Sequence, residues 1–569
     1  MNEKEVVAKL LEQHIESISR EEIIALLEKP KYSNLGDIAF PCFILAKLNK
    51  KSPFEIAQDI AARMDLLPKQ VSKVEAIGGY INFYLNKQVI AENTIDMILR
   101  QKDAYGSSSE GKGKKIVIDF SSPNIAKPMS IGHLRSTIIG NSLSRIYSFL
   151  GYRCININFL GDYGTQFGKL IVAYKKWGKL VAKELVSEPV KALLTLYTKF
   201  HEEAGKENSD LEEEARKEFK KLEEGDKENL RLWKDFRAAS IKEFEKFYDV
   251  LGVKFDSYSG ESFYKDSAAK VIDELVKRKI AVESQGALIV NLDKFNLPPM
   301  LIKKSDGTTL YSSRDLAAAI ARYNSYKFDK MLYVVASEQN TYFKQLFKTL
   351  ELLGLSWARS CNHVNFGMIY MDKGKISTRK GSIIFLEDVL EKIFGLTRKM
   401  IKKDMPEKEK EKIAKAVGVS ALIYSDLSND RIRDIKFDWS RILQLEGDSG
   451  PYLQYTYARA KSILKRAGAK PKRANIKSDL LLSDDEKALV MLLREFPEIV
   501  KDAANQFAPH IIANYALKVA DEFNRFYEKY PVLNASKDER QSRLALTEAV
   551  SHVLKNSFLL LGMIPLEKM

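Results

Sequence analysis

The sequence predicts a multidomain protein that joins an α/β part to an all-α part. A chain of 569 residues is long enough for about three or four domains, each with its own core. Apolar strand-like runs alternate with helical periodicity as far as Leu386, and the central runs have the apolar character of a parallel sheet. Beyond Leu386 the pattern is helical through Met569. We therefore expect a small α/β domain, a parallel-sheet domain with a helical insertion, and a carboxyl-terminal helical bundle.

The amino-terminal part predicts the small α/β domain. Helical periodicity over residues 6–11 is followed by an apolar run over residues 39–46 and a strand-like run over residues 79–85. Residues 101–114 are polar and rich in glycine, which is typical of a linker. We place the first domain with its linker at residues 1–110.

The central part predicts a nucleotide-binding sheet. Strand-like residues 115–120 and 154–159 flank an amphipathic helix that ends at Gly151, which makes one βαβ unit. The loop after its first strand lies where open parallel sheets bind nucleotides. Further strands are expected at residues 330–336 and 364–368, with a helix from Thr341 between them. We therefore expect a Rossmann-type domain over residues 111–385.

Two further segments complete the predicted architecture. Residues 175–250 are rich in lysine and glutamate with helical periodicity, and their mixed charge favours solvated helices over a nucleic-acid-binding tract. This segment is the expected helical insertion. Residues 386–442 are expected to form a helical connection, and residues 443–569 a helical domain.

The loop before the central helix has side chains suited to a nucleotide. Gly132 would let a flat base approach the backbone, and His133 can donate a hydrogen bond to a phosphate oxygen. Lys127 adds a full positive charge, and the helix amino end adds a partial one. The alternative is an ordinary strand-to-helix loop whose histidine is satisfied by packing.

Composition limits the partners and the compartment. A net charge of +15 suggests a polyanionic partner but does not distinguish tRNA from other polyanions. There is no apolar run of about 20 residues and no signal-peptide pattern, so we expect a cytoplasmic protein without a membrane span. The three cysteines are far apart and the six histidines lack metal-ligand spacing, so we expect neither a disulfide nor a structural metal. We expect a monomer.

Several blocks resemble one family in order along the chain. Residues 121–140 resemble the first signature of class I aminoacyl-tRNA synthetases in its arginyl form, and residues 161–168 resemble an arginyl-specific block. Further arginyl-like blocks are residues 305–308, 310–317, 338–339, 377–381 and 450–455. Because they span nearly the whole chain, the sequence is identified as a member of the arginyl-tRNA synthetase family.

The resemblance implies a reaction and its substrates. The family ligates L-arginine to tRNA(Arg) through an arginyl-adenylate, with ATP and Mg²⁺ as the substrate complex and AMP and pyrophosphate as products. The resemblance also implies that the Rossmann-type domain is catalytic, that the amino-terminal domain contacts tRNA and that the carboxyl-terminal domain binds the anticodon. Two alternatives remain: another class I synthetase, or a catalytically silent RNA-binding paralogue.

The resemblance also implies the arginine and nucleotide contacts. Tyr311 and Asp315 lie four residues apart on one helix face, where Asp315 would pair with the guanidinium. The full arginine-binding set is Ser122, Asn124, Glu261, Tyr311, Asp315 and Gln339. The ATP-binding set is Pro128, Ile131, Gly132, His133 and Met368. The catalytic set is Lys127, Ser130, Gly132, His133, Lys375, Ser377, Arg379 and Lys380.

Two departures from the class pattern concern the phosphate contacts. Ser130 stands where the class has the first signature histidine, so a short hydroxyl replaces one imidazole. The second signature, residues 375–381, has Thr378 where the class-wide form has a lysine. In the family a lysine just upstream of the first signature is thought to compensate, which indicates Lys127, while Lys375 and Lys380 remain candidates.

The expected RNA contacts are aromatic and basic. In the amino-terminal domain Phe40 and Phe83 could stack on unpaired bases, with core packing as the alternative. Around the last block, the anticodon candidates are Tyr452, Gln454, Tyr455 and Arg459. At most one or two of Tyr452, Tyr455 and Tyr457 are expected to touch RNA, and basic pairs at 465–466 and 470–473 could bind phosphates.

Overall fold

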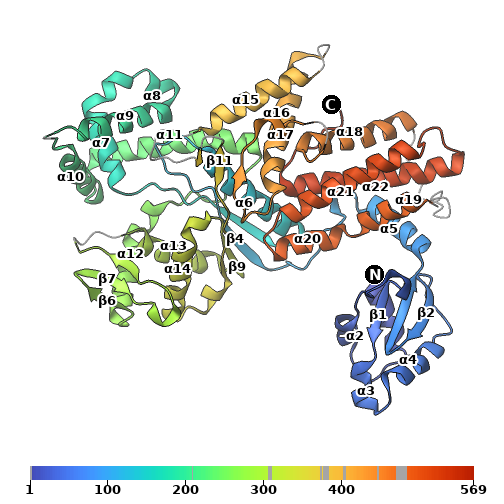
Figure 1. Cartoon of the computed structure of the whole chain (residues 1–569). Helices are drawn as coiled ribbons and strands as arrows, with labels where there is room; N and C mark the ends of the chain where they lie inside the picture. The colour runs from blue at the N-terminus through green and yellow to red at the C-terminus, as the bar shows by residue number, and fades with distance from the viewer. Residues whose placement is uncertain are drawn as a thin grey trace. The chain divides into compact units, whose positions relative to one another are not determined.

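The computed structural model describes residues 3–207, 209–305, 310–371, 374–375, 384–401, 405–444, 447–468 and 483–569. The chain forms two compact units (Figure 1). Unit 1 comprises Met1–Tyr105, Ala460–Glu495 and Asp521–Val553, and unit 2 comprises Gly106–Arg459, Phe496–Ala520 and Leu554–Met569.

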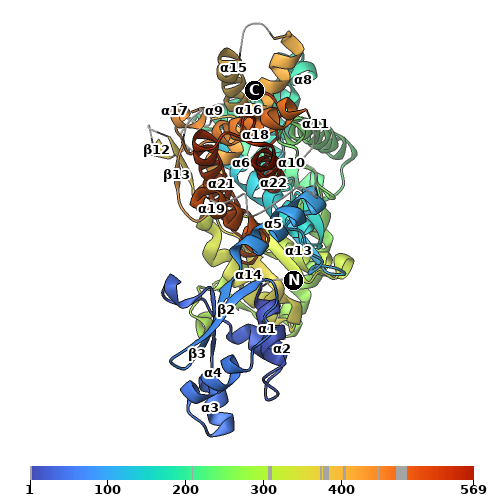
Figure 2. The same ribbon diagram turned by 90° about the vertical axis from the view of Figure 1, so that its right-hand side faces the viewer.

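Unit 1 contains an antiparallel sheet in the order β1 (Ile38–Pro41), β3 (Tyr80–Leu85) and β2 (Val71–Ile77). Helix α4 (Pro53–Ala62) packs against β2 and β3 (Figure 2), and it begins at a capping box between Ser52 and Glu55. The other helices of this part are α1 (Glu3–Glu12), α2 (Arg20–Leu26), the short 3₁₀ helix η1 (Ser33–Leu35) and α3 (Phe43–Asn49). The predicted small α/β domain is confirmed. The same unit holds α5 (Lys87–Gln101), the 3₁₀ helix η2 (Lys102–Ala104) and α19 (Asp484–Arg494), of which α5 and α19 pack together.

Unit 2 is built on a parallel sheet in the order β10 (Cys361–His363), β9 (Lys330–Tyr333), β4 (Lys115–Asp119) and β5 (Arg153–Ile157). Helix α6 (Ile131–Phe149) connects β4 to β5, so the predicted βαβ unit is confirmed. Strand β10 ends before the run over residues 364–368 that the sequence predicted as a strand. The strand at Cys361–His363 therefore lies directly before the apolar residues 364–368 and does not include them.

A helical layer is inserted after β5. It consists of α7 (Thr165–Trp177), η3 (Gly178–Val181), α8 (Glu184–Ser187), α9 (Pro189–Ala204), α10 (Leu211–Glu223) and α11 (Lys227–Leu251). Leu193, Phe200 and Phe244 are buried inside it, while lysines and glutamates pair along its surface, as in Lys217 with Glu213 and Lys175 with Glu218. This arrangement favours the interpretation of solvated helices over a nucleic-acid tract.

The chain then forms a second small sheet that the sequence did not predict. After η4 (Glu261–Tyr264) and α12 (Lys265–Lys277), the strands β6 (Ala281–Ser284), β7 (Ala287–Val290) and β8 (Met300–Lys303) pair antiparallel, with η5 (Asp293–Phe295) between the last two. Two to four apolar residues per strand are too few to show a period against neighbouring helices. Helix α13 (Tyr311–Tyr326), η6 (Ser337–Gln339), α14 (Asn340–Leu352) and η7 (Ser356–Ser360) complete this part.

The last part of the chain is helical with one exception. Strands β11 (Ile369–Met371), β12 (Gly374–Lys375) and β13 (Ile435–Lys436) pair in the order β12-β11-β13, and β13 lies beyond Leu386, where only helices were expected. A two-residue strand carries no periodic signal. The helices are α15 (Leu386–Met400), α16 (Glu407–Leu427), α17 (Trp439–Ile442), α18 (Gly450–Ala467), α20 (Phe496–Asn505), α21 (His510–Lys529) and α22 (Lys537–Leu561). Across the described ranges, no helix is both long and apolar enough to cross a membrane.

Candidate active site

The loop that leaves β4 has an unusual backbone. Ser121 and Ser122 both have positive φ angles, 71° and 47°, in the region that residues other than glycine rarely adopt. The Ser121 N–H donates to Ser136 Oγ at 2.9 Å, and the Ser122 hydroxyl donates to Asp119 Oδ1 at 2.9 Å. The Ser121 hydroxyl also shares a hydrogen bond with the Tyr248 hydroxyl at 2.8 Å. These contacts hold a strained loop in one conformation at the carboxyl end of the sheet, where a nucleotide was expected.

Asn124 lies at the rim of this loop with an exposed side chain. It forms a parallel bridge with Gly161, whose N–H donates to the Pro123 carbonyl at 3.1 Å. A Cβ at Gly161 would lie 2.1 Å from Asn124 Oδ1, so a side chain there would displace the amide. The structure thus brings the first signature and the 161–168 block together, and Gly161 leaves room for Asn124.

The segment that carries Glu261 is anchored by a buried carboxylate. Asp162 is fully buried and accepts hydrogen bonds from Arg237 Nε, the Ser262 N–H and the Ser262 hydroxyl, all at 2.9 Å. Glu261 itself pairs with Arg314 at 2.9 Å. Burial raises the pKa of Glu261, while the Arg314 guanidinium opposes that rise. Glu261 therefore reaches the site as one half of an internal ion pair.

Tyr311 and Asp315 share one face of α13, and Tyr342 of α14 joins them. The Tyr342 hydroxyl donates to Asp315 Oδ2, and the rings of Tyr311 and Tyr342 meet edge to face at 5.2 Å. Burial raises the pKa of Asp315 from 3.8 to about 7. Gln339 is exposed at the end of η6, directly before the helix that carries Tyr342. Sequence reasoning missed Tyr342 because the periodicity of α14 drew attention to its apolar face alone.

Asp315 has the properties of a receptor for a cation. Within the described residues it forms no ion pair, although its side chain is largely withdrawn from water. A buried carboxyl without a cationic partner is driven toward its neutral form, and an arriving guanidinium would favour the charged form. The aromatic rings of Tyr311 and Tyr342 provide flat surfaces beside it for a planar group.

His133 is held as a neutral hydrogen-bond donor. Its Nδ1 accepts the Ser130 N–H at 3.1 Å and lies 3.0 Å from the Ser130 hydroxyl. Burial lowers the pKa of His133 to about 4, so the ring is neutral near pH 7. A neutral imidazole whose Nδ1 accepts a hydrogen bond carries its proton on Nε2. Ser130, in the place of the first signature histidine, therefore helps to fix this tautomer.

The space above the first signature is open at Gly132. The residue is exposed, and a Cβ there would meet only Ser130 Oγ, at an ordinary contact distance of 3.6 Å. The fold therefore does not require glycine at this position, whereas a ligand lying on the helix amino end would. This is the pattern expected where a nucleotide approaches the backbone.

Lys127 faces the helical insertion. Its Nζ lies 4.9 Å from the ring centroid of Tyr197 on α9, and burial lowers its pKa. Its charge also contributes to lowering the pKa of His133, so the two side chains lie near each other. Lys127 therefore lies close to His133 and packs against Tyr197 of the insertion helix α9.

The other nucleotide candidates differ in what they can offer. Pro128 and Met368 are half-buried, and the Met368 N–H donates to Asp434 Oδ1 at 2.7 Å. Ile131, also in the predicted ATP-binding set, is fully buried, so its side chain packs in the core and is not available to a nucleotide. Its N–H donates to the Ile384 carbonyl at 3.1 Å, which uses the backbone donor as well.

The second signature is only partly visible. Ser377, Arg379 and Lys380 lie outside the described residues, as does most of the 305–308 block, and of Lys375 the structure describes the strand position in β12. The chain immediately after the signature is described. The Leu386 N–H donates to the Met129 carbonyl at 2.9 Å, and Phe385 bridges Ser130. The two signatures are therefore joined through this flank.

Arg135 is a residue of the site region that sequence reasoning missed. It is buried in α6, pairs with Asp426 of α16 at 3.3 Å, and donates to the carbonyls of Gly367 at 2.5 Å and Arg433 at 2.9 Å. It thereby ties the first-signature helix to the segments around β11 and β13. The available signal was an arginine within the apolar pattern of the helix.

Two amino-terminal candidates for RNA contact are corrected. Phe40 and Phe83 are both 0% exposed, at the centre of the core of unit 1. A ring enclosed on both faces cannot stack on a base, so the packing alternative holds. Strand periodicity does not reveal which face of a small sheet is covered by helices.

The carboxyl-terminal candidates divide in the same way. Gln454 is 0% exposed and donates to Ser420 Oγ at 3.0 Å and the Ile564 carbonyl at 2.6 Å, so its prediction as a tRNA contact is wrong. Tyr455 is 43% exposed, with the Arg459 guanidinium 4.8 Å from its ring centroid. Tyr452 is half-buried and Tyr457 is buried. These residues lie on α18, which begins at Gly450.

The last predicted features are the basic residues 465–466 and 470–473 and the absence of a structural metal. Lys465 and Arg466 are exposed at the end of α18, while residues 470–473 lie outside the described residues. In the part of the chain that the structure describes, no group of three or more histidine, cysteine or acidic side chains is arranged to hold a metal ion.

Comparisons with known proteins find matches along nearly the whole chain. Three family models match in order: the arginyl tRNA synthetase N terminal domain over residues 5–85, the catalytic domain of class I (R) tRNA synthetases over residues 94–439, and the DALR anticodon binding domain over residues 453–569. The chain is 47% identical to the arginine–tRNA ligases of Alkaliphilus metalliredigens and Halothermothrix orenii, over 100% of this chain and 99% of each relative.

Solved structures show the same architecture. Arginyl-tRNA synthetase of Thermus thermophilus superposes with a TM-score of 0.78 at 23% identity, covering 100% of this chain and 99% of that one. The Plasmodium falciparum enzyme gives 0.77 at 25% identity, covering 100% and 98%. With full-length identity near one half and three matching domain models, this chain belongs to the arginyl-tRNA synthetase family of class I aminoacyl-tRNA synthetases.

Proposed function

We propose that the protein ligates L-arginine to tRNA(Arg), using ATP to form an arginyl-adenylate and releasing AMP and pyrophosphate. Family membership supports the reaction. The observation that carries the substrate choice is the Asp315 carboxyl, withdrawn from water, capped by the Tyr342 hydroxyl and left without an ion pair among the described residues. Such a group favours a cationic, hydrogen-bonding side chain over a neutral one of the same shape.

The proposed arginine site has two ends. Asp315 pairs with the guanidinium, and Tyr311 lies beside it. Ser122, Asn124 and Gln339 contact the other end of the amino acid from the two loops at the carboxyl edge of the sheet. Glu261, whose charge is partly balanced by Arg314, faces the α-ammonium group. When arginine is bound, its ammonium group meets the Glu261 carboxylate. When the site is empty, Arg314 still balances that carboxylate.

The proposed ATP site lies at the amino end of α6. His133 donates from Nε2 to a phosphate oxygen, and Gly132 leaves room for the nucleotide. Lys127 compensates for the missing second-signature lysine, together with Lys375 and Lys380. Ser377 and Arg379 complete the catalytic set. Pro128 and Met368 contact the nucleotide. ATP enters with Mg²⁺ as its counter-ion. The arginine carboxylate attacks the α-phosphate and pyrophosphate leaves, so positioning and charge neutralisation suffice and no enzyme nucleophile is needed.

The proposal extends to the second substrate. The arginyl group passes from the adenylate to the terminal ribose of tRNA(Arg), at the 2′-hydroxyl. Tyr455 and Arg459 are the leading anticodon contacts because they combine an exposed ring with a cation, and Tyr452 is the next. The protein is proposed to act as a monomer in the cytoplasm, with its domains at residues 1–110, 111–385, 386–442 and 443–569.

The test is amino-acid-dependent exchange of pyrophosphate into ATP, followed by aminoacylation of tRNA(Arg). Arginine is compared with citrulline, which has nearly the same shape without the charge, and with lysine, which has the charge without the planar fork. Exchange and charging with arginine alone support the proposal. Activity with another amino acid would show that the substrate is not arginine and favour another class I synthetase. Tight tRNA binding without exchange would identify a silent paralogue. Exchange is measured with and without tRNA.

A further inference from the structure

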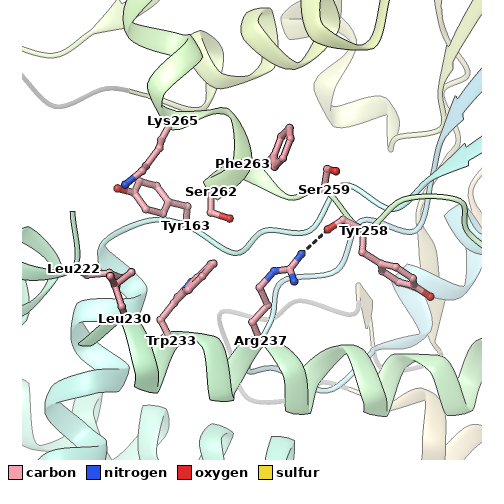
Figure 3. Close-up of a pocket in the computed structure, with 10 residues that line it drawn as sticks. All are labelled: Tyr163, Leu222, Leu230, Trp233, Arg237, Tyr258, Ser259, Ser262, Phe263 and Lys265. Carbon is pink, nitrogen blue, oxygen red and sulfur yellow. Dashed lines mark hydrogen bonds between the residues drawn. The ribbon is translucent and has the colours of Figure 1, made fainter. Parts of the chain in front are cut away.

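A pocket of about 530 Å³ lies between the helical insertion and the segment that carries Glu261 (Figure 3). Trp233 and Arg237 point from α11 toward Ser262 and Phe263 of η4. Tyr163, the residue after the buried Asp162, also lines the pocket. Its volume is within the range of about 300 to 1,000 Å³ that small-ligand sites occupy. The function proposed above assigns nothing to it.

The chemistry of the pocket favours a flat ring with a negative charge. Four aromatic side chains line it, together with two cations, Arg237 and Lys265; the aromatic residues are Tyr163, Trp233, Tyr258 and Phe263. Phe263 is 70% exposed, which is a large apolar surface to leave in water. Aromatic rings stack on nucleobases of any sequence, and basic side chains neutralise phosphate.

The same chemistry disfavours arginine and other cations. The nearest buried carboxylate, Asp162, already accepts hydrogen bonds from Arg237 and from both donors of Ser262. Glu223, the hydrogen-bond partner of the lining residue Tyr163, accepts from the Tyr163 hydroxyl at 3.2 Å. A cationic ligand would therefore meet the charges of Arg237 and Lys265, while Asp162 and Glu223 are already engaged by donors.

The pocket adjoins the proposed arginine site along the chain. Ser262 and Phe263 directly follow Glu261 in η4, and Tyr163 directly follows Asp162, two residues after the Gly161 that contacts Asn124. A ligand held by Phe263 thus lies on the same short segment as a residue proposed to contact the amino acid.

We propose that this pocket binds an unpaired nucleotide of the 3′-terminal single strand of tRNA, with its base on the aromatic side chains and its phosphate beside Lys265. The proposal rests on the proposed function, because that function requires the 3′ end of a tRNA to reach the arginine. A free adenine nucleotide has the same ring and charge, and the test separates the two.

The test measures the affinity of wild type and Phe263→Ala for tRNA(Arg) and for the same tRNA lacking its last three nucleotides. The measurements are made without arginine or ATP. Phe263 is mostly exposed, so its removal leaves little cavity; Phe295→Ala, at a phenylalanine that is 41% exposed on η5, is the matched control. The proposal predicts that Phe263→Ala weakens binding of intact tRNA by roughly tenfold and leaves binding of truncated tRNA unchanged. The control should change neither.

A second variant tests the phosphate contact. Lys265→Gln should make the dependence of log affinity on log salt shallower by roughly 0.7 for intact tRNA, the contribution of one single-stranded phosphate, and should not change it for truncated tRNA. Equal effects on both RNAs, or no effect on either, would overturn the proposal. So would a Phe263→Ala enzyme with unchanged tRNA affinity and a raised KM for ATP, since the pocket would then take the free nucleotide.

The outcomes separate this proposal from the proposed function. If charging with arginine fails but Phe263→Ala still discriminates between intact and truncated tRNA, the function is wrong and the pocket stands. If charging succeeds but the two RNAs respond equally, the function stands and the pocket has no role in holding the 3′ end.

Discussion

Asp315 at the proposed arginine end of the site and His133 at the proposed ATP end are both half-buried, and loss of water acts on their pKa values in opposite directions. It raises the pKa of the acid to about 7 and lowers the pKa of the base to about 4. Both groups are thereby pushed toward their neutral forms. The expected consequences differ, because Asp315 would have to be charged to hold a guanidinium, whereas a neutral His133 would still be able to donate from Nε2.

The difference teaches how one site can treat two substrates of opposite charge. At the proposed arginine end the substrate itself would supply the charge that stabilises the carboxylate, so binding and ionisation would be coupled. At the ATP end the Ser130 N–H and hydroxyl fix the imidazole before the nucleotide arrives. Binding of arginine is therefore expected to depend on pH near neutrality, whereas binding of ATP at His133 is not.

The largest expected effect is at the arginine end. Asp315→Asn keeps the shape and removes the charge, so kcat/KM for arginine should fall by roughly 100-fold or more, as for other broken buried ion pairs of about 3 to 5 kcal/mol. Pyrophosphate exchange at saturating ATP measures it. Asp273→Asn, at an exposed acid of α12, is the control and should be unchanged. A loss below threefold would show that Asp315 does not hold the guanidinium.

His133→Ala should affect the other substrate. Loss of a hydrogen bond to a charged group costs about 1.5 to 3 kcal/mol, so kcat/KM for ATP should fall by roughly 10- to 150-fold. The KM for arginine should stay within about twofold, since His133 lies at the other end of the site. Equal losses for both substrates would mean that the variant disturbs the loop after β4 rather than one contact.

Gly132→Ala separates folding from nucleotide binding. The fold has room for the methyl group, and alanine favours a helix over glycine by about 1 kcal/mol, so thermal stability should stay equal or rise. The same methyl group would overlap a nucleotide on the backbone and should lower kcat/KM for ATP by roughly tenfold. A variant with normal ATP kinetics would place the nucleotide elsewhere.

Ser130→Ala should have the smallest effect. It removes the hydroxyl near His133 Nδ1 but keeps the backbone N–H that donates to the same atom. We expect a loss of roughly two- to tenfold in kcat/KM for ATP, the value of one neutral hydrogen bond of about 0.5 to 1.5 kcal/mol. In the double variant with His133→Ala the two losses should not add, because Ser130 acts through His133. Additive losses would instead indicate a direct contact between Ser130 and ATP.

The sequence predicted those features that depend on neighbouring residues. The βαβ unit follows from the apolar run before residue 120 and the period of α6, and the shared face of Tyr311 and Asp315 follows from their spacing. The family resemblance contributed the residue roles. The short strands β6, β7, β8 and β13 escaped prediction because their pairing depends on distant segments.

Contacts between distant residues explain the other differences. Tyr342 meets Asp315 and Arg135 meets Asp426 only after the sheet has formed, 27 and 291 residues apart in sequence. Phe40, Phe83, Ile131 and Gln454 have suitable side chains but are buried, which composition does not reveal. Conversely, the exposure of Tyr455 and Phe263 became visible only in the folded chain.

The most direct test of the contrast is the pH dependence of kcat/KM for each substrate, measured by pyrophosphate exchange with the other substrate saturating. The pKa of Asp315 is raised, so the carboxyl is protonated below pH 7 and must lose its proton to bind arginine. We predict that kcat/KM for arginine falls toward tenfold per pH unit below about pH 7 and that Asp315→Asn abolishes this slope. kcat/KM for ATP should show no matching inflection from His133, whose pKa is about 4. A flat arginine profile through pH 7, or the same slope in Asp315→Asn, would contradict the account.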